Sequence, residues 1–144
     1  MAEHETIEAE ITGWCASYVD AFNKNDAEQI SAHWHFPALI LHQRQSFVFK
    51  TADHFTKNTS KLLAFYKRQV VEAVRRKLNS YMAMSDDVVS MVVDDVMLGT
   101  ADEVIVSWRS AYILRRNDAG WRACSAVADG EAKAWENRGT PMGS

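Results

Sequence analysis

The chain has 144 residues, a formal net charge of -3, 47% hydrophobic residues and 24% charged residues. This length and composition are typical of one folded domain and exclude a disordered or fibrous protein. The negative charge argues against nucleic acid as a partner, because non-specific nucleic-acid binding is mainly electrostatic.

The apolar runs, such as FPALIL from residue 36, are far shorter than the roughly 20 residues that cross a bilayer. The first ten residues are acidic and polar, unlike a secretory signal. Cys15 and Cys124 lie far apart without a metal-binding or redox spacing, which favours reduced thiols. We therefore expect a cytoplasmic protein with no membrane partner.

Apolar residues recur at spacings of three and four near the start of the chain, the pattern of a helix that buries one face. They are Ile7, Ile11, Trp14, Cys15, Tyr18 and Phe22. Asn25, followed three residues later by Glu28, predicts the capped start of a short helix that runs through Ile30 toward Trp34.

The next segments predict a hairpin and a third helix. Phe36 precedes Pro37 and is therefore expected to be extended. The β-rich runs ALILH and SFVFK flank QRQ, which is consistent with a hairpin. Thr51 can cap the helix that follows. Its buried positions are Phe55, Leu62, Leu63 and Tyr66.

Residues 70–78 fit a helix and a strand equally well by periodicity. A strand from about Ala73 is favoured, because three long β-like runs follow it, separated by turn-rich segments. The four runs together predict an antiparallel meander. Only residues 137–144 have the composition of a flexible tail, so a single domain is expected over residues 1–136.

Alternation along the last two runs predicts which side chains face inward. The inward set of the first is Val104, Val106, Trp108, Ser110, Tyr112 and Leu114; that of the second is Trp121, Ala123, Ser125, Val127 and Asp129. The opposite positions form a basic outer face: Arg75, Lys77, Arg109, Arg115 and Arg122. Adjacent Asp94 and Asp95 point to opposite faces and cannot be a facing carboxylate pair.

The segment SAHWHFPALILH, residues 31–42, contains three histidines. His33 and His35 lie two apart at a predicted helix end and point in different directions, so no metal site is expected. His42 would face inward with Ile40, and imidazole titrates near neutrality, which makes it a candidate base. The alternative is a strand-end histidine with its polar tip in solvent.

The order helix, short helix, hairpin, helix and four-stranded meander is similar to that of the nuclear transport factor 2-like superfamily. YVDAFNKND (residues 18–26), PALI at the start of the first strand and GWR at the start of the last also resemble it. The resemblance includes SnoaL-like and ketosteroid isomerase-like members. It implies an α+β, cystatin-like cone: a curved antiparallel sheet wrapped around N-terminal helices, with an internal pocket.

The resemblance also implies roles for particular residues. Tyr18 matches a helix tyrosine that, in the steroid isomerase branch, donates to a developing enolate oxygen. The alternative for Tyr18 is a core tyrosine on the buried face of the first helix. His42 falls at that branch's base position and Tyr112 at its second donor, although the branch has aspartate at each. The catalytic candidates are thus His42, Tyr18 and Tyr112. Residues expected to line the pocket are Trp14, Trp34, Ile40, Trp108, Ser110, Trp121, Ser125 and Asp129.

The expected function is the binding of a small apolar or aromatic ligand in a largely apolar pocket. The least strained chemistry is that of a cofactor-independent isomerase or cyclase; the alternative is a non-catalytic dimeric binding or accessory subunit. The resemblance implies a homodimer through the outer sheet face, for which pairing with Asp95 or Glu72 across the two subunits is a hypothesis.

Overall fold

The computed structural model describes residues 2–142, and side chains from residue 6 onward. Four α-helices and six strands, with one short 3-10 turn, make up this part of the chain. In order they are α1 (Ala2–Asn23), α2 (Ala27–Ser31), β1 (Trp34–His42), β2 (Gln45–Phe49), α3 (Ala52–Arg68), β3 (Ala73–Ser85), β4 (Val88–Leu98), η1 (Thr100–Asp102), β5 (Val104–Asn117), β6 (Gly120–Val127) and α4 (Asp129–Arg138).

The strands form one curved, open sheet in the order β2-β1-β6-β5-β4-β3. The meander β3 to β6 is antiparallel, and β1 pairs with β6 in parallel. Parallel strands need a long crossover connection, and the chain between β1 and β6 provides one. The α+β class and the curved sheet are confirmed, with this one parallel pair as the departure from an antiparallel sheet.

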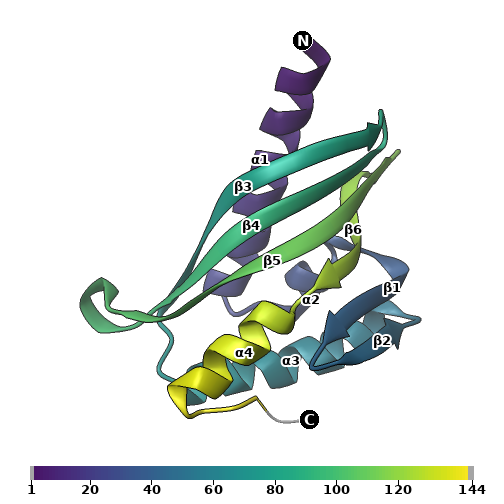
Figure 1. Cartoon of the computed structure of the whole chain (residues 1–144). Coiled ribbons are helices and arrows are strands. Elements are labelled where there is room, and N and C mark those ends of the chain that lie inside the picture. The colour runs from purple at the N-terminus through teal and green to yellow at the C-terminus, as the bar shows by residue number, and fades with distance from the viewer. Residues whose placement is uncertain (1, 143–144) are drawn as a thin grey trace.

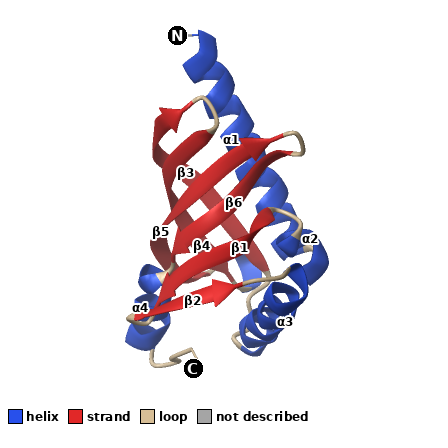
Figure 2. Cartoon of the chain, turned by 90° about the vertical axis from the view of Figure 1, so that its right-hand side faces the viewer, coloured by secondary structure: helices blue, strands red, loops and turns tan. Residues whose placement is uncertain are grey.

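The helices lie around the sheet at different places. In Figure 1, α1 runs behind the meander, and α3 and α4 lie at the end of the molecule opposite the N-terminus. The view in Figure 2, turned by 90°, shows α3 and α4 on different sides of that end. The end of the molecule opposite the N-terminus is therefore flanked by two helices.

The start of α2 is capped by Asp26 and not by Asn25. Asp26 Oδ1 accepts a hydrogen bond from the Gln29 amide at 3.1 Å, while Asn25 has a φ of 56° and turns the chain out of α1. Asparagine tolerates this left-handed conformation better than most residues. The predicted short helix through Ile30 is confirmed, but it ends at Ser31 and stops short of Trp34, which opens β1.

The hairpin and the third helix are confirmed. Gln43 and Arg44 connect β1 to β2 with φ values of 52° and 65°, the conformation of a type I′ turn achieved without glycine. Thr51 caps α3 through a hydrogen bond that its side chain accepts from the His54 amide at 3.2 Å. The cap fixes where α3 begins, and Phe55 in its first turn is buried.

The strand assignment from Ala73 is confirmed, and the alternation along β5 holds from Val106 to Leu114. Val104 departs from it, because its side chain is 58% exposed at the start of the strand. Ile105 is buried in its place and packs against the chain near Gly99, where a Cβ would lie 3.1 Å from Ile105 Cδ1.

A bulge interrupts β6 and reverses its faces. Leu114 lies opposite Ala123, whereas Ile113 lies opposite Ser125, so Cys124 is one extra residue in the strand. An extra residue shifts the alternation by one position. Ala126 therefore points inward, and Ser125 does not.

The chain beyond β6 forms α4, a helix that is not among the elements expected from the sequence. Asp129, expected on the inward face of a strand, is the first residue of this helix and is exposed. Residues 137 and 138, expected in a flexible tail, belong to α4, and Met142 packs against the core. The backbone oxygen of Met142 accepts a hydrogen bond from Gln43 Nε2 at 3.5 Å. Residues 143–144 lie outside the described part.

Candidate functional site

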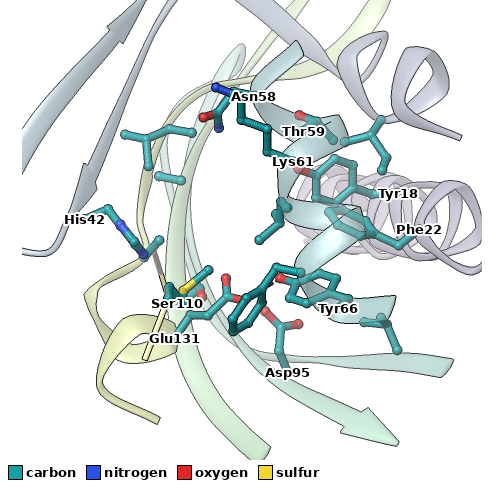
Figure 3. A pocket seen from close by; sticks show the side chains of 18 of the residues that line it. Tyr18, Phe22, His42, Asn58, Thr59, Lys61, Tyr66, Asp95, Ser110 and Glu131 are labelled. Carbon is teal, nitrogen blue, oxygen red and sulfur yellow. Dashed lines mark hydrogen bonds between the residues drawn. The ribbon is translucent and has the colours of Figure 1, made fainter. Parts of the chain in front are cut away.

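A cavity of about 510 Å³ lies between the sheet and the helices. Its wall is mainly aliphatic and aromatic, with contributions from α1, α3, α4 and every strand. Figure 3 shows an open centre with His42 on one side, Tyr18 and Phe22 across from it, and Glu131, Tyr66 and Asp95 at one end. A mostly apolar space with a few inward polar groups is typical of a small-molecule site.

The structure brings seven of the residues nominated from the sequence to the wall of this cavity. They are Tyr18, Trp34, Ile40, His42, Trp108, Ser110 and Tyr112. Four others lie outside it: Trp14, Trp121, Ser125 and Asp129.

Each of these four has a physical reason for its position. Trp14 is in the core, where its ring stacks on Tyr18 at 4.8 Å between centroids. Trp121 lies near the start of β6, with the Arg116 guanidinium 5.1 Å from its ring centroid. Ser125 is turned outward by the bulge at Cys124, and Asp129 opens α4.

Tyr18 presents a hydroxyl that can donate into the cavity. Its oxygen accepts a hydrogen bond from Trp34 Nε1 at 2.9 Å, and only 4% of the residue is exposed. Burial and the neighbouring Tyr112 raise the pKa of Tyr18 well above its ordinary value. The hydroxyl therefore stays protonated, and its proton is not used in the bond to Trp34.

Arg76 and Asp95 form a buried ion pair at one end of the cavity. Two bonds join them, Nε to Oδ1 at 2.7 Å and Nη2 to Oδ2 at 3.0 Å, and their side chains are 6% and 3% exposed. Nη2 also donates to the Tyr112 hydroxyl at 2.8 Å. Burial lowers the pKa of Arg76, but Tyr112 and Asp95 outweigh it and keep the guanidinium charged.

This pairing corrects the expectation that Asp95 serves an interface between subunits. Asp95 faces inward and is bonded to Arg76 of the same chain. Its neighbour Asp94 is on the outer face, where it accepts hydrogen bonds from Arg109 and Asn79. Placing the two adjacent aspartates on opposite faces was correct.

Glu131, which sequence reasoning missed, is the second buried acid in the wall. Tyr66 Oη and, at 3.2 Å, Trp135 Nε1 both donate to its Oε2. Burial raises the pKa of Glu131 to about 7, although these two hydrogen bonds oppose the rise. The spacing of Ala132 and Trp135 is the sequence signal of a short helix that could have indicated it.

The three histidines of residues 31–42 have separate environments. His33 is held by the Gln29 carbonyl at 2.6 Å and the Ser17 hydroxyl at 2.7 Å, and His35 is exposed. His42 lines the cavity, and its Nε2 is buried without a hydrogen-bond partner among the described residues. Burial lowers the pKa of His42, opposed by Asp129, which favours the neutral imidazole.

The curved sheet, the helices on its inner side and the apolar cavity with inward polar groups define an NTF2-like cone. The chain belongs to the family described as NTF2-like protein (DUF6841), which matches residues 8–131. No curated protein matches this sequence.

Solved structures show the same fold at low sequence identity. Rv3472(D26N), a protein of unknown function from Mycobacterium tuberculosis, is 17% identical with a TM-score of 0.66, covering 88% of this chain and 73% of that one. An NTF-2 like protein of unknown function from Shewanella oneidensis is 10% identical with a TM-score of 0.67, covering 83% and 96%. A ketosteroid isomerase-like protein from Erwinia carotovora atroseptica is 15% identical with a TM-score of 0.60, covering 83% and 92%.

Among the helices that the structure describes, none is both long enough and apolar enough to span a bilayer.

Proposed function

We propose that the cavity binds a small, largely apolar molecule that carries a carbonyl or similar oxygen, and that the protein is a cofactor-independent enzyme of the isomerase or cyclase type. The observation that carries this proposal is the pair of unpartnered nitrogens in an apolar wall. Arg76 Nη1 and His42 Nε2 are both buried without a hydrogen-bond partner among the described residues. A buried polar atom without a partner destabilises a protein by about 1–3 kcal/mol, which a hydrogen bond to a bound ligand would offset.

The Arg76 guanidinium lies between two tyrosines of the cavity wall, and its Nη2 is bonded to the hydroxyl of one of them, Tyr112. The Arg76 guanidinium is 5.3 Å from the ring centroid of Tyr18 and 4.7 Å from that of Tyr112. Such donors stabilise the charge that develops on a carbonyl oxygen when a proton leaves the neighbouring carbon. Tyr18 and Arg76 are the proposed donors of this reaction, with Tyr112 bonded to Arg76 beside them, and two wall residues, His42 and Glu131, can accept a proton.

The binding step is tested with an enolisable two-ring ketone, 2-tetralone. Trp34 and Trp108 line the cavity, so tryptophan fluorescence reports its occupation. Ala126 also lines the cavity, whereas its neighbour Ser125 does not. We expect Ala126→Phe to abolish binding and the matched Ser125→Phe to retain it. Native mass spectrometry of the purified protein would identify a co-purified ligand; equal binding by both variants would contradict the proposal.

The second candidate function is a non-catalytic dimeric binding or accessory subunit. It is supported by aliphatic side chains on the outer sheet face: Leu39, Val48, Ile113 and Val127 are 37–54% exposed. The strand register places Leu39 opposite Val48, and places Leu39 and Ile113 opposite the same residue, Ser125. A contiguous apolar patch of this kind suits a second copy of the chain.

A further inference from the structure

Glu131 is directed into the cavity by the way α4 packs against β5. Gly130, just before it, lies so close to the strand that a Cβ there would be 2.6 Å from the Arg109 carbonyl oxygen. Only glycine permits this approach without displacement. Glu131 is 8% exposed and belongs to the cavity wall; Figure 3 shows its side chain at the edge of the open centre.

The carboxyl group is held by one oxygen only. Tyr66 and Trp135 both donate to Oε2, and Oε1 makes no hydrogen bond with the residues that the structure describes. Both donors are fixed, since Tyr66 is 6% exposed and Trp135 fully buried. One oxygen is thus anchored, and the other is available to a molecule in the cavity.

We propose that Glu131 is the catalytic residue that takes a proton from the carbon next to the carbonyl of a ketone bound in the cavity. The C–H bond breaks, its electron pair forms the carbon–carbon double bond of an enolate, and the proton bonds to Oε1. The electron pair of the carbonyl π bond moves to the carbonyl oxygen, which accepts hydrogen bonds from Tyr18 and Arg76. Return of the proton to carbon restores the carboxylate, so no further reactant is consumed. This inference rests on the proposed function.

The surroundings of Glu131 suit a base that works near neutral pH. Burial raises its pKa to about 7, and a catalytic base is most effective when its pKa lies near the working pH. The titratable and charged groups that act on Glu131 are Tyr66 on α3, Arg76 on β3, Asp95 on β4 and Tyr112 on β5. Arg76 is already paired with Asp95, and their charges offset each other. Glu131 therefore has no cationic side chain bonded to it among the described residues.

The experiment measures hydrogen exchange at the carbons next to the carbonyl of 2-tetralone in deuterated buffer, followed by NMR. We expect Glu131→Gln to lower the exchange rate about 100-fold, the lower end of what a general base contributes. The exposed Glu136, on the same helix, provides the matched control, and Glu136→Gln should retain the parent rate. An unchanged rate in Glu131→Gln, with a comparable loss in His42→Ala, would overturn the assignment in favour of His42.

A second variant separates proton transfer from mere structural support. The hydrogen bond from Tyr66 lowers the pKa of Glu131, so Tyr66→Phe should move the pH profile of exchange to higher pH. A reduced rate with the profile unmoved would indicate only structural support and would contradict the proposal. If 2-tetralone binds the parent by fluorescence without accelerated exchange, the inference fails while the proposed binding function stands. If it does not bind, the proposed function fails.

Discussion

Replacing Glu131 with glutamine should change the stability of the protein in a pH-dependent way. Burial raises the pKa of Glu131 from 4.5 to about 7. In this interval the folded chain still holds a proton that the unfolded chain has released. The free energy of unfolding therefore falls as the pH rises through the interval, because the folded state binds more protons than the unfolded state.

The magnitude follows from the two pKa values. One pKa unit corresponds to about 1.36 kcal/mol, so a rise from 4.5 to about 7 destabilises the folded state by about 3 kcal/mol once the pH exceeds both values. A glutamine amide does not ionise, and its oxygen can still accept from Tyr66 and Trp135. We expect Glu131→Gln to match the parent at about pH 4 and to be more stable by about 3 kcal/mol at about pH 8.

Urea unfolding at these two pH values, followed by tryptophan fluorescence, measures the difference. Glu136→Gln removes an exposed carboxylate from the same helix and should show no comparable pH-dependent gain. A difference between Glu131→Gln and the parent that is equal at both pH values would refute the reasoning. So would a loss of stability at about pH 8, since it would mean that the ionised carboxylate is stabilised in the folded state.

Three further predictions concern stability and assembly. Arg76→Met should destabilise the protein by about 3–5 kcal/mol because it leaves Asp95 buried and unpaired. Denaturant unfolding measures the loss. A loss below about 1 kcal/mol, which is typical of an exposed ion pair, would contradict the buried ion pair. Asp26→Ala should cost about 1 kcal/mol by removing the α2 cap, whereas Asn25→Gly should be tolerated because its φ is positive; equal losses would count against this cap assignment. If the outer face forms a homodimer, Val48→Lys should give a monomer by light scattering, and an unchanged dimer would place the interface elsewhere.

Elements with a local signal were predictable from the sequence. The stripe of α1, the Thr51 cap of α3 and the alternation of β5 are each set by residues close together in the chain. The α1 stripe and the β5 alternation predicted that Tyr18 and Tyr112 face inward, and the family resemblance supplied their role and that of His42; all three line the cavity. The resemblance to the superfamily supplied the order in which these elements pack.

Features that depend on distant contacts were not predictable. The bulge at Cys124 exists in the pairing of two strands, and nothing in the local sequence shows that Ser125 will face outward. The short helix α4 has few apolar residues, and it is held by the close approach of Gly130 to β5. Because α4 was missed, Glu131 was missed with it.

The polar cluster at the end of the cavity shows the same limitation. Asp95 was recognised as one of two adjacent acids on opposite strand faces, but its partner Arg76 lies 19 residues earlier on a neighbouring strand. Spacing predicts that Arg76 points away from Arg75 and Lys77, yet it does not indicate which acid it meets. Such pairs become visible only when the strand register is known.

The docking of residues 140–142 against the cone has a practical consequence for handling the protein. Met142 lines the cavity and its backbone is bonded to Gln43 in the β1–β2 turn. A C-terminal affinity tag that displaced Met142 would change the wall of the cavity in which the proposed ligand binds. A tag before α1 would lie at the far end of the molecule (Figure 1), so ligand screening should use the N-terminal fusion.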